Sequence, residues 1–273
     1  MISQITNCLK ELRLAGKKGL IPFITAGDPD LAGTVAIARR MAAAGADIIE
    51  LGIPFSDPLA DGPVIQQASG RALASGTTLP RIFEAVKEIR IDCRTPLVLM
   101  GYYNPIYKYR IRRFAQDAAA AGVNGLIVPD LPHEESGPLR EAALVAGLDL
   151  IPLVAPTTTD QRMEKIAADA RGFIYCVSVT GVTGARVEIK TDLAGFTDRV
   201  RRHTSLPLAV GFGIAGPEQA ARVAEHCDAV VVGSAIVKLI AECGNTVTAG
   251  PAVEQLVRRI RAALDQLVVG CKS

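Results

Sequence analysis

The sequence predicts a single α/β domain built as a (β/α)8 barrel, and three observations support this fold class. Short apolar runs alternate about eight times with longer segments of helical period. The runs are almost continuously apolar, which is typical of parallel strands covered by helices on both faces. The chain has 273 residues and no Pro-, Gly- or Ser-rich linker, a size that suits one such barrel. We therefore expect one domain over residues 1–273.

The strands are predicted where β-branched and apolar residues cluster, at intervals that leave room for a helix between them. In chain order they are Leu20–Thr25, Ile48–Leu51, Leu97–Met100, Gly125–Val128, Leu150–Val154, Phe173–Val177, Leu208–Val210 and Ala229–Val232.

Helices are predicted between the strands from amphipathic period and local caps. Before Leu79–Ile89, for example, Thr78 is a suitable N-cap and Pro80 suits the first turn. The predicted helices are Leu31–Ala44, Gly62–Ala74, Leu79–Ile89, Ile111–Ala121, Ser136–Ala146, Asp160–Ala170, Asp192–Thr204, Pro217–His226 and Val253–Leu267, with a short helix starting at Ser234.

The first residues add a helix outside the repeating pattern. Ile5, Leu9 and Leu12 recur on one face, and we expect this N-terminal helix to plug the bottom of the barrel. An open doubly wound sheet is the rival architecture, but no G-x-G-x-x-G follows the first strand. In a TIM barrel, catalytic residues lie at the carboxyl ends of the strands, so the segments after the strands are the place to look.

Composition excludes several classes of protein. Thirty Lys and Arg against 28 Asp and Glu leave a net charge of +2, too little to grip nucleic acid or an anionic membrane. Charges interrupt the N-terminal segment, so it is no secretory signal, and no apolar run suits a membrane span. The six cysteines lie far apart without metal-ligand spacing. We expect reduced thiols, no metal site and a cytoplasmic protein.

Glu50 is the first catalytic candidate because it interrupts the apolar run of the second predicted strand. Burial raises the pKa of a carboxyl group and favours a role in proton transfer. The alternative is a structural carboxylate satisfied by backbone or by an arginine.

The loop that follows Glu50 carries two aspartates among three prolines. Prolines stiffen a loop, so Asp57 and Asp61 are expected to be held in place. One of them could share a substrate with Glu50, which gives two carboxyl groups in different environments for acid and base duties. For Asp61 the alternative is capping of the helix that follows.

Three glycine-rich stretches follow the last three strands, beginning at Gly181, Gly211 and Gly233. Backbone N–H groups in such loops, with the N-terminus of the short helix at Ser234, predict a phosphate site. Isolated turns are the alternative. The segment Val179–Lys190 is long and predicts a lid over the substrate, with an unstructured loop as the alternative.

The remaining polar residues near strand ends are less decisive. Tyr175 lies within a strand and could donate a hydrogen bond into the barrel mouth. Asn104 and Asp130 follow strands and suit either the rim or a partner contact. The three histidines show no metal spacing, and structural roles are expected for them.

Several motifs resemble those of the tryptophan synthase α chain family. The most specific is ELGIPFSDPLADGP, residues 50–63. Similar stretches cover nearly the whole chain, with a less distinctive segment after Gly244: PFITAGDP at 22–29, GYYNP at 101–105, PDLP at 129–132, APTT at 155–158, GVTGAR at 181–186 and GFGI at 211–214.

The resemblance implies a lyase without a cofactor of its own, which cleaves indole-3-glycerol phosphate to indole and glyceraldehyde 3-phosphate by a retro-aldol reaction. It also implies a partner β chain with pyridoxal phosphate, which receives the indole through an internal tunnel in an α2β2 tetramer. The residues agree with this chemistry. Indole is a poor leaving group as a carbanion and leaves readily only when C3 has first been protonated, so a positioned acid is required.

By resemblance, Glu50 is the acid and Asp61 accepts the indole N–H. The implied substrate-binding residues are Phe23, Tyr175, Thr183, Gly184, Phe212, Gly213, Gly233 and Ser234, with Met100, Leu126 and Leu153 as further candidates for the indole slot. The implied contacts for the β chain are Pro54, Phe55, Ser56, Asp57, Pro58, Asn104 and Pro105.

Two other functions are weighed against the lyase. A chain that only binds and activates a β chain would need the docking loop but neither Glu50 nor Asp61. A sugar-phosphate isomerase or synthase would need a Lys, a His or a metal at other strand ends, and none is in place.

Overall fold

All strands of the computed structural model, which describes residues 3–177, 192–211 and 213–270, belong to one parallel sheet. Along the chain they are β1 Gly19–Thr25, β2 Ile49–Gly52, β3 Leu97–Met100, β4 Gly125–Ile127, β5 Asp149–Leu150, β6 Leu153–Val154, β7 Ile174–Val177, β8 Leu208–Gly211 and β9 Ala229–Val232. Their order in the sheet is β5-β4-β3-β2-β1-β9-β8-β7-β6.

The strands at the two ends of this order, β5 and β6, are parts of one interrupted strand. Between them, the N–H of Ile151 donates to the carbonyl oxygen of Leu126 at 2.8 Å, and the carbonyl oxygen of Pro152 accepts from Tyr175 at 3.0 Å. The segment therefore bonds to neighbours on both sides and closes the sheet into the predicted (β/α)8 barrel, which is confirmed. The expected continuous strand Leu150–Val154 is broken because Pro152 has no N–H to donate.

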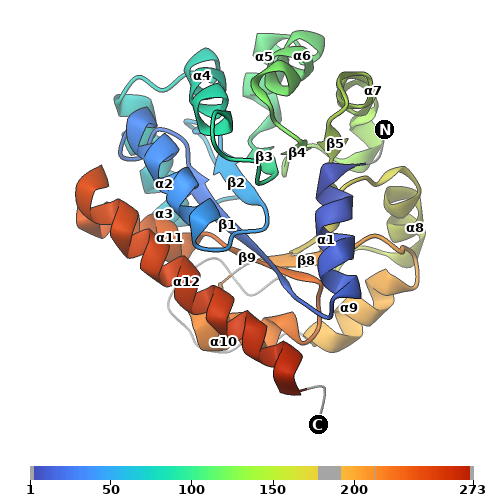
Figure 1. Ribbon diagram of the computed structural model, residues 1–273. Coiled ribbons are helices and arrows are strands. Elements are labelled where there is room, and N and C mark those ends of the chain that lie inside the picture. The colour runs from blue at the N-terminus through green and yellow to red at the C-terminus, as the bar shows by residue number, and fades with distance from the viewer. Residues whose placement is uncertain (1–2, 178–191, 212, 271–273) are drawn as a thin grey trace.

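The helices surround this barrel (Figure 1). They are α1 Gln4–Leu14, α2 Leu31–Ala43, α3 Pro63–Ala74, α4 Leu79–Arg90, α5 Tyr103–Tyr109, α6 Ile111–Ala121, α7 Gly137–Ala146, α8 Asp160–Asp169, α9 Leu193–Arg201, α10 Pro217–Ala224, α11 Ser234–Cys243 and α12 Thr246–Gly270, with a 3-10 turn at His133–Glu135.

Two helices differ from the prediction. The short α5 was not expected; its first N–H, that of Tyr103, bonds to the Asp130 carboxylate at 2.9 Å, a contact between distant parts of the chain. The last helix begins at Thr246 and not at Val253, because the Asn245 side chain accepts from the N–H of Thr248 at 3.1 Å and caps an earlier turn. The other helices lie where they were predicted, with small shifts at their ends.

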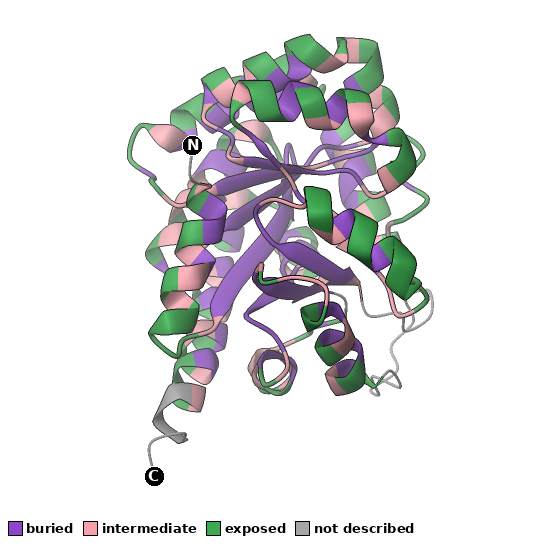
Figure 2. Cartoon of the chain, turned by 90° about the vertical axis from the view of Figure 1, so that its right-hand side faces the viewer, coloured by how far each residue is buried: buried purple, intermediate pink, exposed green. Residues whose placement is uncertain are grey.

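Side chains of the strands alternate between two cores. Ile21, Ile127 and Phe173 belong to an inner core within the barrel, while Leu20 and Leu126 pack outward against the helices. Figure 2 shows the strands buried along their length and the helices buried on one side only. The inner core is therefore separate from the layer between sheet and helices.

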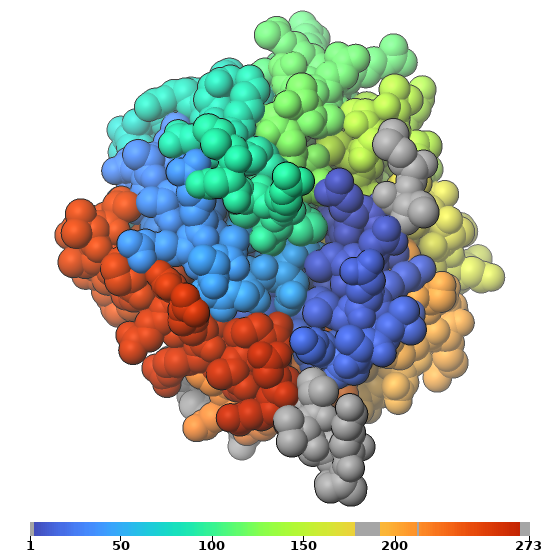
Figure 3. Space-filling view, in the orientation of Figure 1, coloured from blue at the N-terminus to red at the C-terminus, as the bar shows by residue number. Residues whose placement is uncertain are grey.

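The N-terminal helix α1 plugs the barrel as predicted. Ile5 and Leu9 are 0% and 1% exposed and belong to the inner core. The Thr6 hydroxyl donates to the carbonyl oxygen of Gly172 at 2.8 Å, and the Ser3 hydroxyl bonds to Asp149. In Figure 3 the dark blue N-terminal residues pack against the body of the molecule on this face. The opposite end of the barrel, at the carboxyl ends of the strands, is not covered by α1 and is where an active site is expected.

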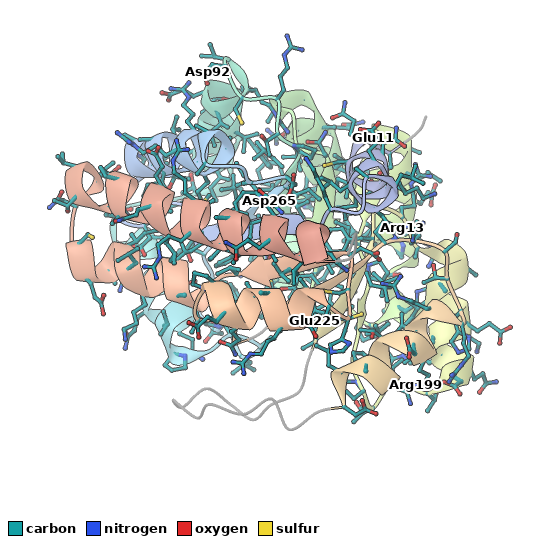
Figure 4. The ribbon with its side chains drawn as sticks, turned by 60° about the horizontal axis from the view of Figure 1, so that its bottom comes forward. Glu11, Arg13, Asp92, Arg199, Glu225 and Asp265 are labelled. Atoms are coloured by element: carbon teal, nitrogen blue, oxygen red, sulfur yellow. The ribbon has the colours of Figure 1, made fainter. Side chains whose placement is uncertain are left out.

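Charged side chains belong mainly to the outer layer. Figure 4 labels Glu11 and Arg13 of α1, Arg199 of α9 and Asp265 of α12, all on helices around the barrel. Within the described ranges, no helix has both the length and the apolar character needed to cross a bilayer. The predicted lid, Val179–Lys190, lies outside the described residues.

Candidate active site

One buried carboxyl group differs from the others that the structure describes. Asp28, Asp149 and Asp228 each lie 2.8–3.2 Å from an arginine. Glu50 is 1% exposed, and neither of its oxygens has a hydrogen-bond partner among the described residues. A buried polar group without a partner costs folding free energy, so it needs an explanation in function. The alternative that Glu50 is satisfied by backbone or by an arginine is wrong for the part of the chain described.

The strand register explains why Glu50 faces the barrel interior. Glu50 lies beside Phe23 of β1 and Val98 of β3. Its neighbours Ile49 and Leu51 point outward into the core under the helices. Burial and the negative charge of Asp61 raise the pKa of Glu50 to about 8. Glu50 is therefore a protonated acid at neutral pH.

Asp61 lies in the loop between β2 and α3 and faces the same mouth. Its Oδ2 accepts a hydrogen bond from the hydroxyl of Tyr102 at 3.0 Å. Burial raises the pKa of Asp61 to about 6, while this hydrogen bond acts in the opposite direction. The alternative role of helix cap is wrong, because Gly62 is the N-cap of α3 and the Asp61 carboxylate bonds to Tyr102. The site thus holds one acid that is protonated at pH 7 and one that is ionised.

Tyr175, on β7 across the barrel, is close enough to feel the charges of Glu50 and Asp61. It lies in β7 beside Leu153 and Ala209, belongs to the inner core, and its hydroxyl lies against Gly211. Burial, followed by the charges of Glu50 and Asp61, raises its pKa well above the ordinary value. Tyr175 therefore stays protonated and can donate a hydrogen bond.

An apolar slot begins next to Asp61. A small cavity is lined by Phe23, Thr25, Gly52, Ile53, Asp61, Ile65, Ser69, Met100, Gly101 and Tyr102. Phe23 and Met100 pack together there, as expected for slot residues, and Leu153 lies at the edge of the inner core. The expectation for Leu126 is wrong, because strand alternation turns Leu126 outward under the helices and leaves Ile127 inside.

The structure describes three of the four residues whose backbone was expected to hold phosphate, namely Gly213, Gly233 and Ser234. Strands β8 and β9 are neighbours, so the loop with Gly213 and the start of α11 at Gly233 and Ser234 follow adjacent strands. Gly213 has φ +73°, a conformation that favours glycine. Gly233 precedes the predicted helix start at Ser234, where backbone N–H groups have no partner within the helix. Thr183, Gly184 and Phe212 lie outside the described residues.

The amino-acid sequence is similar to those of known proteins over most of its length. The sequence model of "Tryptophan synthase alpha chain" matches residues 9–266. The tryptophan synthase alpha chain of Geobacter sulfurreducens is 50% identical over 263 residues, 96% of this chain and 99% of that protein. This chain belongs to the tryptophan synthase alpha chain family.

Solved structures of the family agree with the fold. The tryptophan synthase subunit alpha of Legionella pneumophila has a TM-score of 0.88 and 39% identity, covering 97% of this chain and 100% of that one. A chain of the α2β2 complex of Pyrococcus furiosus tryptophan synthase has a TM-score of 0.84 and 41% identity, covering 90% and 98%.

Five of the seven residues predicted to contact a partner line one groove at the rim. Pro54, Phe55 and Ser56 of the β2–α3 loop line it together with Asn104 and Pro105 of α5. Asn104 and Pro105 thus lie in the first turn of a helix and not in a loop.

The rest of the β2–α3 loop is divided between surface and interior. Pro54 and Pro58 are buried and stiffen the loop, whereas Ser56 and Asp57 are exposed. Leu59, two residues before Asp61, is 92% exposed. The surface beside Asp61 is therefore partly apolar.

No group of three or more His, Cys, Asp or Glu that could hold a metal occurs within the described ranges. His133 and His203 lie 3.5 and 3.6 Å from Asp169 and Asp160, at the outer helices. The structural roles expected for these histidines are consistent with those contacts.

Two further side chains at the site were not predicted from the sequence. Tyr102 lies two residues after the end of β3, and the signals for it were this position and its place in the motif at 101–105. Thr25 ends β1 at 2% exposure, and its hydroxyl has no partner among the described residues although it lines the slot beside Asp61. Only contacts between distant parts of the chain show that Tyr102 bonds to Asp61 and that Thr25 lines the slot.

Proposed function

We propose that Glu50 and Asp61 carry out the reaction of the tryptophan synthase alpha chain family in this protein. The chain is a carbon–carbon lyase of tryptophan biosynthesis, which cleaves indole-3-glycerol phosphate to indole and glyceraldehyde 3-phosphate. The observation that carries the residue assignment is the buried Glu50 carboxyl group, which has no ionic partner among the described residues and lies near Asp61.

Glu50 supplies and recovers one proton. As an acid it protonates C3 of the indole ring, which places positive charge at the ring nitrogen. The resulting carboxylate then takes the proton from the hydroxyl on the carbon attached to C3. The C–C bond breaks, its electron pair returns to the ring as indole, and the hydroxyl carbon becomes the aldehyde of glyceraldehyde 3-phosphate. A pKa of about 8 keeps Glu50 protonated for the first step.

Asp61 balances the charge that this protonation creates. With a pKa of about 6 it is ionised at neutral pH, so it can accept the indole N–H and stabilise the positive ring. Phe23 and Met100 would hold the ring, with Tyr175 donating near Glu50. Backbone N–H groups at Gly213, Gly233 and Ser234 would hold the phosphate, whose binding energy positions the reacting carbon. The roles of Thr183, Gly184 and Phe212 rest on the family resemblance.

The family works with a β chain, and we assign the groove at the rim to that partner. The Pyrococcus furiosus relative is described as an α2β2 complex with mutual activation. For this chain we propose the same α2β2 assembly, with contacts from Pro54 to Pro58 and at Asn104 and Pro105. The alpha chain needs no cofactor of its own, and pyridoxal phosphate belongs to the proposed partner. Five described cysteines are free, in keeping with a reducing cytoplasm.

The test is to mix purified chain with indole-3-glycerol phosphate and follow indole release with and without a β chain. We expect slow release from the chain alone and a large rise with the β chain; equal rates would contradict the assigned partner. Glu50→Gln should lose cleavage in both states while it still activates the β chain. Retained cleavage by this variant would show that Glu50 is not the acid, and loss of both functions would indicate misfolding.

A further inference from the structure

We propose that Tyr102 is a positioning residue that holds the Asp61 carboxylate for catalysis and links it to the partner-facing side of the β2–α3 loop. This role rests on the proposed function and concerns how the partner regulates it. The evidence is three contacts of the buried Tyr102 side chain, with Phe55, Ala60 and Asp61.

The hydroxyl of Tyr102 makes two hydrogen bonds to consecutive residues of the loop. It accepts from the N–H of Ala60 at 2.9 Å and donates to Oδ2 of Asp61 at 3.0 Å. Among the described residues, no other group is hydrogen-bonded to the Asp61 carboxylate. One oxygen, that of the Tyr102 hydroxyl, takes part in both bonds. The Asp61 carboxylate and the backbone of Ala60 are therefore held in a fixed position relative to each other.

The ring of Tyr102 contacts the other end of that loop. Phe55 stacks on it with ring centroids 5.2 Å apart and an interplanar angle of 30°. Phe55 is half-buried and lines the rim groove, while Tyr102 is 6% exposed. The Tyr102 side chain therefore contacts both Phe55, which lines the groove proposed for the partner, and the catalytic carboxylate.

Tyr102 is itself held by rigid structure. It lies two residues after the end of β3 and is the N-cap residue of α5. The next residue, Tyr103, donates its N–H to Asp130 after β4 at 2.9 Å. Because its backbone is anchored between two strands, Tyr102 provides a fixed point against which the loop with Asp61 is placed.

The chemistry of the contact suits the role of Asp61. A neutral hydroxyl that donates to a carboxylate favours the ionised form, which the indole N–H requires as acceptor. With Oδ2 directed to Tyr102, Oδ1 has no hydrogen bond among the described residues and can serve the substrate. A partner that moves Phe55 in the groove would shift the stacked ring and, through its hydroxyl, the carboxylate.

The first test compares two tyrosine variants of the full chain. Tyr102→Phe keeps the ring stacked on Phe55 and removes the hydroxyl. We expect kcat for indole release to fall about 10- to 100-fold with little change in KM, as for a lost hydrogen bond to a charged group. The acid limb of the pH–rate profile should move to higher pH, because Asp61 loses a donor that favours its ionised form.

The matched control is Tyr103→Phe. This adjacent tyrosine packs on Tyr107 with centroids 5.9 Å apart, and its hydroxyl has no hydrogen bond among the described residues. It should keep the kcat and the acid limb of the unaltered chain. If Tyr102→Phe also keeps both, or if the two variants lose activity equally with an unmoved acid limb, the positioning role is refuted.

The second test concerns activation by the β chain at saturating concentration. We expect the ratio of rates with and without the β chain to fall in Phe55→Leu and in Tyr102→Phe, and the double variant to lose no more than Tyr102→Phe alone. Additive losses, or normal activation of Tyr102→Phe, would refute the link. Failure of the proposed function is distinguishable, because then the unaltered chain itself would release no indole.

Discussion

Replacing Glu50 by Gln is expected to stabilise the protein while it removes the catalytic acid. Glutamine has nearly the shape of glutamic acid but cannot ionise. The pKa of Glu50 is about 8 in the folded protein against an ordinary value of 4.5. Between these values the unfolded chain releases a proton that the folded protein retains, so the stability of the unaltered protein falls as the pH rises through this window.

The size of the effect follows from the two pKa values. Integrated to pH 7, the difference costs the unaltered protein about 3 kcal/mol, and integrated to pH 5 it costs about 1 kcal/mol. Glu50→Gln should therefore gain stability relative to the unaltered chain by an amount that grows about fourfold from pH 5 to pH 7.

The assay is urea unfolding followed by circular dichroism at both pH values. The matched control is Glu141→Gln, an exposed residue of α7, whose effect on the free energy of unfolding should be within about 0.5 kcal/mol at either pH. A Glu50→Gln variant that is less stable than the unaltered chain at pH 7, or whose gain does not depend on pH, would refute the buried, unpaired state of Glu50.

Three further predictions concern activity and packing. The pH dependence of kcat/KM should be bell-shaped, rising near pH 6 as Asp61 ionises and falling near pH 8 as Glu50 loses its proton; a flat steady-state profile across this range would contradict the roles. In the plug helix, Leu9→Ala should lower the free energy of unfolding by about 3 kcal/mol, while Leu14→Ala, 88% exposed on the same helix, should change it little in urea titrations. Gly70→Ala in α3, where an added Cβ meets nothing within 4 Å, should raise the thermal midpoint through about 1 kcal/mol of added helix stability, and a lowered midpoint would count against it.

The periodic pattern of the sequence was sufficient to predict the barrel, because strand alternation and helical period are local properties. Proline and glycine also act locally, which is why the stiff loop after Glu50 and the turn at Gly213 could be anticipated. The motif from Glu50 to Pro63 was specific enough to indicate the family before any contact was known.

Contacts between distant residues were decided by tertiary structure alone. The start of α5 depends on a bond from Tyr103 to Asp130, which no local pattern encodes. The outward direction of Leu126 depends on which face of β4 meets the helices.

The same holds at the site. From sequence, Glu50 could equally have been satisfied by an arginine, as Asp28, Asp149 and Asp228 are in the folded chain. Sequence determined which residue types stand at the strand ends. Only the closed barrel determined that Glu50 has no partner among the described residues and that Tyr102 reaches Asp61, because burial and hydrogen bonding depend on what the rest of the chain brings to each atom.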